Sequence, residues 1–484
     1  MNYEPVIGLE VHVELKTNTK LFCGCSTVFG IEANTQVCPV CLGLPGTLPV
    51  INAKAIEFAA KVGLALNCTV ATHSKMDRKN YFYPDLPKAY QISQYDQPLN
   101  MNGYLEISSS SGTKRIKIVR IHLEEDAGKL VHAGGKAGRL DASEYSLVDY
   151  NRGGVPLVEI VSAPDLNSGE EAYEYLTSLK NILLYIGVSD CNMEEGSLRC
   201  DANVSVHPKG SSVLGTKVEV KNMNSFKFCK QAIEYEIKRQ IARLENHEAI
   251  LQESRLWDIT ENKTRVMRSK EEAHDYRYFP EPDLVPIILS SEWIDGIKES
   301  LPELPSEKQK RFIQSYQLSE YDAKVLVNDQ SIAAWYELAV QAYPTNAKGI
   351  ANWMMGDLAA QLNENKTDIF KLKIEPQHLA ELVELIDQNV ISSKQAKDIF
   401  LEMFQTGQFP KMIVKSKNLI QINDPLIIEQ AISKIINEYS QIVQQYKSGK
   451  QSVFGFLVGK TIQATDGKAN PKMVNEMLKK NLDV

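Results

Sequence analysis

The sequence has few cysteines for its 484 residues, and it lacks long apolar stretches. Eight cysteines are too few for a disulfide scaffold in a chain of this size, which favours a reducing compartment. No run of about 18 apolar residues occurs, so no transmembrane helix is predicted. The first predicted strand begins about five residues into the chain, which leaves no room for a signal or transit peptide. We therefore expect a protein of the cytoplasm.

The sequence also lacks a strong excess of one charge. Its 54 lysines and arginines against 61 aspartates and glutamates give a net charge of −7. This balance argues against a protein that coats nucleic acid electrostatically, although a local basic surface could still dock a structured RNA. Because the length exceeds a single hydrophobic core, we expect two or three domains.

The residue pattern changes along the chain. Roughly the first 290 residues show strand-type alternation, interrupted by helical spacing after Ser168 and after Ser225. Strands are predicted at residues 115–125, 155–162, 198–206 and 217–221. From about residue 306 onward the pattern is that of capped helices, the last two opening at Asp424 and Asn470. The sequence therefore predicts an α+β fold, with a mixed or antiparallel sheet domain followed by helical domains.

The segment from Val6 to Leu15 alternates between apolar and polar side chains. Apart from Gly8, the polar parity consists of Glu10, His12 and Glu14. An extended strand sends alternate side chains to opposite faces, so one face would be buried and the other would align two carboxylates and an imidazole. Such groups suit a metal site or an acid–base site, and a solvated surface strand is the alternative.

Two later strands carry a carboxylate among apolar neighbours. Glu125 and Glu159 each share their parity with apolar residues on the same strand. An unpaired carboxylate in that position would be costly, so each needs a cation or several hydrogen-bond donors. Both are candidate ligands or catalytic groups. For Glu159 the alternative is a buried structural ion pair, for which Arg120 or Arg152 could serve.

A further strand places Arg199, Asp201 and Asn203 on one parity, opposite apolar residues. Several strands that bury one face and carry charge on the other indicate a sheet with a polar cleft. Mixed arginine, lysine and carboxylate groups suit phosphoryl chemistry, in which catalysis is mainly positioning and neutralisation of charge.

Four of the eight cysteines form two close pairs, Cys23 with Cys25 and Cys38 with Cys41. Two pairs separated by a short loop are typical of a tetrahedral zinc site that is closed and structural. The first pair is tighter than the usual two-residue gap, and buried free thiols or a redox pair are the alternatives. Aromatic and basic residues also alternate in two proline-rich segments, 77–95 and 274–283, where nucleobases could stack on the rings.

Five long motifs occur in register along the chain, at residues 8–15, 77–84, 122–128, 194–203 and 275–283. Together they resemble the B-subunit family of tRNA-dependent amidotransferases, which convert Asp-tRNA(Asn) to Asn-tRNA(Asn) and Glu-tRNA(Gln) to Gln-tRNA(Gln). The resemblance implies a cradle-shaped catalytic domain at 1–293 with a zinc-knuckle insertion at 23–43. It also implies a helical domain at 294–408 and a helical tail domain at 409–484 that contacts the tRNA.

The resemblance implies an enzyme that uses ATP to phosphorylate the side-chain carboxylate of a misacylated tRNA. Ammonia from a glutaminase A subunit would then displace the phosphate, and a C subunit would complete a heterotrimer. The implied substrate is Asp-tRNA(Asn), Glu-tRNA(Gln) or both. The implied cofactors are ATP, Mg²⁺ and a structural Zn²⁺.

By the family pattern, His12, Glu125 and Glu159 would hold Mg²⁺ and take part in catalysis. Cys23, Cys25, Cys38 and Cys41 would hold the zinc. Further catalytic candidates are Glu10, Lys79 and Asp201, and candidates for binding the substrate are Tyr81, Lys88 and Arg199. The alternative function is a zinc-stabilised, tRNA-binding scaffold subunit without catalysis of its own.

Overall fold

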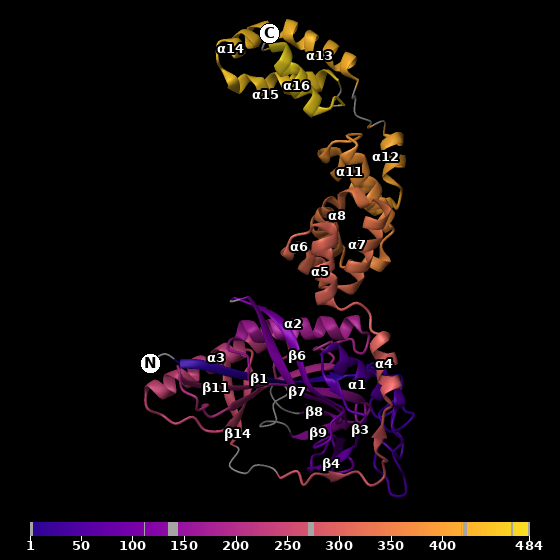
Figure 1. Cartoon of the computed structure of the whole chain (residues 1–484), viewed down its shortest axis with the longest axis vertical. Coiled ribbons are helices and arrows are strands. Elements are labelled where there is room, and N and C mark those ends of the chain that lie inside the picture. The colour runs from indigo at the N-terminus through magenta and orange to yellow at the C-terminus, as the bar shows by residue number, and fades with distance from the viewer. Residues whose placement is uncertain are drawn as a thin grey trace. The chain divides into compact units, whose positions relative to one another are not determined.

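The structure of the chain is a computed structural model that describes residues 3–110, 112–133, 144–269, 275–417, 419, 424–465 and 468–482 (Figure 1). The chain forms two units, Met1–Pro305 and Ser306–Val484. The described strands all lie in the first unit, and the second unit is helical. This arrangement confirms the predicted α+β fold. Across the described ranges, no helix combines the length and apolar character needed to cross a membrane.

A nine-stranded sheet is the frame of the first unit. In their order across the sheet, the strands are β14 (Lys263–Ser269), β13 (Glu253–Asp258), β12 (Val218–Lys221), β11 (Leu198–Pro208), β1 (Tyr3–Glu14), β10 (Pro156–Ser162), β7 (Gly112–Glu125), β6 (Asn100–Ser109) and β2 (Thr69–Val70). Neighbouring strands are antiparallel except for the parallel pair β12–β13, so the sheet is mixed, as predicted.

Alternation along the central strands separates an apolar face from a polar face. In β1 the odd-numbered residues from Ile7 to Val13 are almost completely buried, whereas the even-numbered positions carry Glu10, His12 and Glu14. The antiparallel register continues this division into β10, β7 and β11. The polar face therefore extends over several neighbouring strands.

Helices cover the apolar face of the sheet. The helices of the first unit are α1 (Ala53–Ala65), α2 (Gly169–Tyr185), α3 (Phe226–Glu245) and α4 (Ser291–Glu299). Buried side chains of α1, α2 and α3 belong to the same core cluster as the apolar residues of the strands. The hydroxyls of Ser168 and Ser225 accept hydrogen bonds from the backbone N–H groups of Glu171 and Phe228, which caps the two helices that the sequence predicts.

Helix α1 is absent from the sequence-based expectations. Its alanine-rich segment has little contrast between its faces, because Ala55, Ala59 and Ala60 are as buried as the larger residues around them. The residue that could have indicated the start of this helix is Asn52. Its side chain accepts a hydrogen bond from the N–H of Lys54 and so caps the helix.

Three small sheets complete the first unit. The first has three strands, in the order β15 (Phe279–Pro280), β4 (Asp77–Asn80) and β5 (Tyr90–Ser93). The second pairs β16 (Ile287–Ile288) with β3 (His73–Ser74), and the third pairs β8 (Lys129–Ala133) with β9 (Tyr145–Asp149). The first of them joins the described parts of the two aromatic segments. Within it, the N–H of Asn80 donates to the carbonyl of Tyr276 at 2.9 Å, and Arg78 Nε donates to Glu281 at 2.7 Å.

The second unit consists of short helices, several of which have a side-chain cap at the N-terminus. They are α5 (Pro305–Tyr316), α6 (Glu320–Val327), α7 (Gln330–Ala342), η3 (Pro344–Asn346), α8 (Ala347–Trp353), η4 (Met354–Leu358), α9 (Ala359–Asn365), η5 (Ile369–Lys371), α10 (Pro376–Asp387), α11 (Ser393–Thr406), α12 (Pro410–Ser416), α13 (Pro425–Glu438), α14 (Ser440–Lys447), η6 (Gln451–Val453), α15 (Phe454–Ala464) and α16 (Pro471–Leu482). The predicted openings at Asp424 and Asn470 are present: each side chain accepts a hydrogen bond from the second residue after it. The last four α-helices share one apolar core that includes Ile432, Leu457 and Leu478.

The core of the first unit makes a prediction about α2. Leu179 is fully buried against the sheet, so Leu179→Ala should lower the free energy of unfolding by about 2–5 kcal/mol through lost burial and a residual cavity. Ser178→Ala, at the half-exposed neighbouring position, should change it by no more than about 0.5 kcal/mol. Equilibrium urea denaturation of the full chain measures both, and equal effects would contradict the assignment of faces.

Candidate active site and cysteine cluster

The register of the central strands brings three predicted site residues together on the polar face. His12 of β1 lies directly opposite Glu159 of β10 on one side and opposite Arg199 of β11 on the other. Glu159 in turn lies opposite His122 of β7. Residues at paired positions of neighbouring strands point to the same face, so these side chains meet above the middle of the sheet.

The resulting cluster consists of two imidazoles and two carboxylates, His12, His122, Glu124 and Glu159. His12 Nε2 lies 3.5 Å from a carboxylate oxygen of Glu159 and 3.8 Å from one of Glu124. His122 Nε2 lies 3.2 Å and 3.5 Å from the same two carboxylates. The hydroxyl of Ser93 donates to Glu124 at 2.9 Å, which fixes that side chain from β5.

The charges of the cluster shift its titration strongly. Burial lowers the pKa of both imidazoles, but the carboxylates outweigh burial, so the pKa of His12 is raised and that of His122 reaches about 9. Burial raises the pKa of Glu159, yet the two imidazoles outweigh it and hold the pKa well below its usual range. The carboxylates are therefore ionised at neutral pH, whereas the imidazole of His12 must lose its proton before its nitrogen can bind a metal.

His12, Glu124 and Glu159 can hold a metal ion. Each offers one ligand atom, and these atoms lie within 4.8 Å of one another. Two carboxylates and one imidazole are a suitable donor set for Mg²⁺ or Mn²⁺, and three protein ligands leave positions for water and phosphate oxygens. The donor chemistry therefore fits the implied ion.

Of the predicted trio, the structure brings His12 and Glu159 together, and the glutamate that lies with them is Glu124 and not Glu125. Since Glu159 lies opposite His122, the residue that shares its face further along β7 is Glu124. Glu125 has the opposite parity, and its carboxylate accepts hydrogen bonds from Lys88 Nζ at 2.5 Å and from the N–H of Ile92 at 2.9 Å. These are the cation and donor that its burial requires.

Lys79 lies beside the cluster of His12, Glu124 and Glu159. Its ammonium is 5.2 Å from the ring centroid of Tyr276 and 5.8 Å from that of Tyr81. Burial lowers its pKa, but the charges of Glu124 and Glu159 outweigh this effect, and the pKa is raised. Lys79 and Tyr81 are therefore brought to the same place, and Tyr276 is an aromatic partner that sequence reasoning did not single out.

Arg199 lies at the other side of His12 and binds Asp126. Its Nη2 donates to Asp126 at 2.7 Å, while Arg152 Nε lies 3.7 Å from the same carboxylate. Although burial alone would raise it, the two arginines lower the pKa of Asp126 to about 2. Burial and Asp126 raise the pKa of Glu14 to about 9, so Glu14 is protonated at neutral pH. Arg199, Arg152 and Glu14 line a cavity of about 690 Å³.

Glu10 and Asp201 lie opposite each other on β1 and β11. Glu10 accepts a hydrogen bond from Asn203 Nδ2 at 2.9 Å, and Asp201 is paired with Lys221. Lys221 also lies 3.1 Å from Glu219, and despite burial these carboxylates raise its pKa to about 12. The two predicted catalytic candidates are therefore on the polar face, beside Lys221 of the strand that the sequence predicts at residues 217–221.

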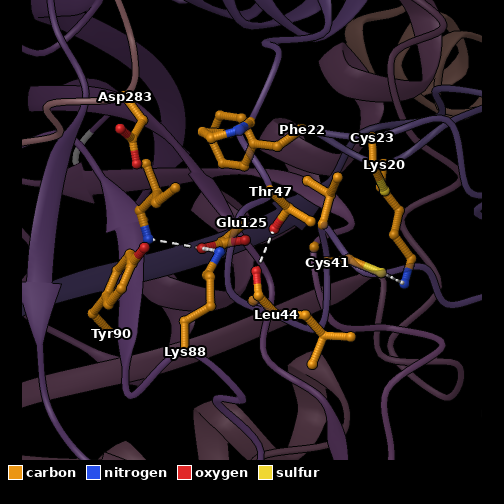
Figure 2. Close-up of a pocket in the computed structure, with 15 residues that line it drawn as sticks. Lys20, Phe22, Cys23, Cys41, Leu44, Thr47, Lys88, Tyr90, Glu125 and Asp283 are labelled. Carbon is orange, nitrogen blue, oxygen red and sulfur yellow. Dashed lines mark hydrogen bonds and ion pairs between the residues drawn. The ribbon is translucent and has the colours of Figure 1, made fainter.

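A second, smaller cavity of about 80 Å³ lies between Glu125 and the cysteine cluster. Figure 2 shows Lys88, Tyr90 and Glu125 on one side of it and Cys41 with Lys20 on the other. Lys88 thus faces Glu125 and not the cluster of His12. A Cβ at Gly43 would overlap Lys88 Cγ at 2.3 Å, so the turn that follows Cys41 packs directly on the Lys88 stem.

The four predicted zinc ligands come together, and all are half-buried. Their sulfur atoms lie within 4.8 Å of one another, and tetrahedral Zn–S bonds of about 2.3 Å require sulfurs about 3.8 Å apart. The hydrogen bond with Cys23 and the charge of Lys20 lower the pKa of Cys41 to about 4, against the effect of burial. The donor set therefore fits a structural Zn²⁺.

Comparison with known proteins first defines the class. Residues 5–295 match the family described as the GatB/GatE catalytic domain, and residues 334–482 match the family described as the GatB domain. The polar face and the cysteine cluster both lie in the first of these ranges.

Full-length relatives define the family further. The chain is 57% identical over 482 residues to a protein of Caldanaerobacter subterraneus subsp. tengcongensis and 56% identical over 482 residues to one of a Thermoanaerobacter species. It is 53% identical over 482 residues to one of Persephonella marina. All three carry the name of the B subunit of aspartyl/glutamyl-tRNA(Asn/Gln) amidotransferase, and each comparison covers 100% of both chains. The chain belongs to the GatB family, which confirms the resemblance.

The ligand assignment on the polar face is testable by metal binding. Glu124→Gln should weaken Mn²⁺ binding at least about tenfold, because changing even an outer partner of a metal ligand costs about 10–100-fold. Glu125→Gln should leave the affinity near that of the wild type, since Glu125 faces Lys88. Calorimetric titration of the full chain measures both. The reverse order of effects would restore Glu125 as the ligand.

The cysteines make a second prediction. Burial raises the pKa of Cys68 to about 12 and that of Cys191 to about 11, so both should resist alkylation at pH 8 in the folded protein.

The cluster cysteines should resist iodoacetamide while metal is bound and react after a chelator removes it. Mass spectrometry of each site reads the result, and equal reaction of the cluster cysteines with and without chelator would rule out a bound metal.

Proposed function

We propose that this chain is the B subunit of a tRNA-dependent amidotransferase and carries the kinase and amidation site of that enzyme. Its substrate would be the side-chain carboxylate of Asp on tRNA(Asn), of Glu on tRNA(Gln), or both, and the donor of the phosphoryl group would be ATP. The observation that supports this proposal most directly is the cluster of His12, Glu124 and Glu159 on the polar face of a GatB/GatE catalytic domain. The name that the relatives carry gives the reaction class.

In the proposed first step, a carboxylate oxygen of the amino acid attacks the γ-phosphorus of ATP, and the bond to the leaving ADP breaks. His12, Glu124 and Glu159 would hold Mg²⁺, which supplies positive charge to phosphate oxygens when bound. Lys79 would contribute a second positive charge, because its ammonium is already held toward the same carboxylates by aromatic rings. Positioning and neutralisation of charge are the main requirements of such a transfer.

In the proposed second step, ammonia attacks the acyl carbon and phosphate leaves. Lys88 and Glu125 would form the mouth of the ammonia path, since both line the small cavity and bind each other. Glu10, Asp201 and Arg199 would line the substrate cleft, and Tyr81 would offer a ring beside Lys79. The tetrathiolate site would hold a structural Zn²⁺ and take no part in the chemistry.

This chemistry requires a second subunit that releases ammonia, because the sequence has candidate residues for activating the carboxylate but no amidase nucleophile motif. We propose that an A subunit releases ammonia from glutamine, that a C subunit completes a heterotrimer, and that the complex acts in the cytoplasm. We also retain the division into a cradle domain at 1–293, a helical domain at 294–408 and a tail domain at 409–484 that touches the body of the tRNA. A knuckle insertion at 23–43 would belong to the cradle.

The second candidate is a tRNA-binding scaffold stabilised by zinc. The cysteine cluster would serve it equally well, and the carboxylates around His12 would then act only as structural partners of the two imidazoles. Catalysis by the polar face is therefore the feature that separates the two proposals.

The test uses the reconstituted complex with misacylated tRNA, ATP and ammonium chloride, so that the glutaminase is bypassed. Glu159→Gln and Lys79→Met should each lower the rates of ADP formation and of amidated tRNA formation about 10²-fold or more, because each removes charge that stabilises the transferring phosphoryl group. Binding of the tRNA, measured by filter retention, should remain.

Glu57→Gln is the matched control, since Glu57 pairs with Lys54 and Lys61 on α1, outside the polar face. It should leave all rates unchanged. Normal amidation by both Glu159→Gln and Lys79→Met would favour the scaffold and remove the enzymatic proposal.

A further inference from the structure

Lys20 is buried in an unusual way. Among the described residues it is the one fully buried lysine, with 0% of its surface exposed. Lysine side chains normally keep their ammonium in water, because a buried charge without a partner is costly. The environment of Lys20 must therefore supply negative charge or strong acceptors.

The partners of the Lys20 ammonium are a carbonyl and a sulfur atom. Nζ donates to the backbone carbonyl of Tyr150 at 3.0 Å and to Cys41 Sγ at 3.7 Å, and Figure 2 shows the second of these contacts. A neutral thiol is a weak acceptor, whereas a thiolate bound to a metal carries negative charge. The arrangement suits a thiolate at Cys41.

Lys20 also joins the two cysteine pairs. Its backbone N–H donates to the carbonyl of Cys25 at 3.0 Å, while its side chain reaches Cys41 of the other pair. Its stem is held against Gly154, where an added Cβ would lie 3.4 Å from Lys20 Cδ and 3.7 Å from Cys41 Cβ. Gly154 has φ of +87°, a backbone conformation that favours glycine.

The same segment is tied to the polar face. The N–H of Leu21 donates to the carbonyl of Gly154 at 2.8 Å, and the N–H of Gly154 donates to the carbonyl of Asp126 at 2.8 Å. Asp126 directly follows Glu125. The position of the cysteine cluster is thus linked through short hydrogen bonds to the end of β7.

We propose that Lys20 is a positioning residue of the metal centre, whose ammonium offsets the charge of the metal-bound Cys41 thiolate and anchors it to the backbone at Tyr150. Four thiolates around a divalent cation leave two negative charges, and a buried cation that donates to one sulfur reduces the cost of enclosing them. This inference rests on the proposed zinc site and not on the amidotransferase reaction.

The experiment compares the full-length wild type with Lys20→Met, which keeps a chain of similar length and apolar character at a buried position. Competition with a chromogenic chelator should show Zn²⁺ bound about 10–100-fold more weakly by the variant, the usual effect of losing an outer partner of a ligand. Lys114→Met is the matched control: Lys114 pairs with Glu171 in the same unit, and its loss should leave the Zn²⁺ affinity unchanged.

A second measurement needs no variant. In the metal-loaded wild type, acetic anhydride should leave Lys20 unmodified, and removal of the metal should increase its modification at least tenfold relative to exposed Lys54. The extent of Lys20 modification reports on the contact between its ammonium and the thiolate, and it does not depend on the folding of a mutant.

The outcomes separate this inference from the proposals before it. A wild type that binds no Zn²⁺ overturns both the zinc site and the role of Lys20. A wild type that binds Zn²⁺ but matches Lys20→Met in affinity, or whose Lys20 modification ignores the metal, overturns the role of Lys20 alone. None of these results depends on whether the chain supports amidation.

Discussion

The two faces of β1 and its neighbours depend on one constraint, the alternation of side chains along an extended strand. Because Leu9, Val11 and Val13 are buried against the helices, the side chains at the positions between them lie on the opposite face of the sheet. A shift of one residue in register would exchange the faces, so the large apolar core also fixes the direction of the site residues. The stability of the core and the geometry of the polar face therefore come from the same hydrogen-bond ladder.

The carboxylates of the polar face are charged at some cost, and the surrounding residues offset it. Glu159 is held ionised by two imidazoles, and Glu124 by His122 and Lys79, in spite of deep burial. Asp126 is held ionised by two arginines, whereas its neighbour Glu14 stays protonated. These two neighbouring carboxyl groups thus have opposite protonation states, because the arginines outweigh burial at Asp126, whereas burial and the charge of Asp126 outweigh the arginines at Glu14.

The sequence predicts much of this arrangement, because it depends on local patterns. The alternation of β1, the caps at Ser168 and Ser225, and the grouping of four cysteines can be read from neighbouring residues. Burial alone could not decide between Glu124 and Glu125. A buried carboxylate needs a partner, and Glu125 has one in Lys88, so its burial does not require a metal ion. Only the register between β7 and β10, a long-range property, shows which glutamate meets Glu159. Within β7, the local sequence signal is that His122 and Glu124 have the same parity, so their side chains lie on one face of the strand.

The position of Glu125 gives the cysteine cluster more than a local role. Glu125 and Lys88 line one side of the small cavity, and Cys41 lies on the other (Figure 2). Gly43, which follows Cys41 in the same turn, also lines it. Any displacement of that turn would move the surface against which the Lys88 stem packs, because no space remains at Gly43. The cysteine cluster is tied to the end of β7 by the hydrogen bonds from Leu21 through Gly154 to Asp126, and the closed metal site that we propose there would take no part in the chemistry of the polar face. Its proposed contribution is to keep one wall of the small cavity fixed while the reaction that we propose takes place on the polar face.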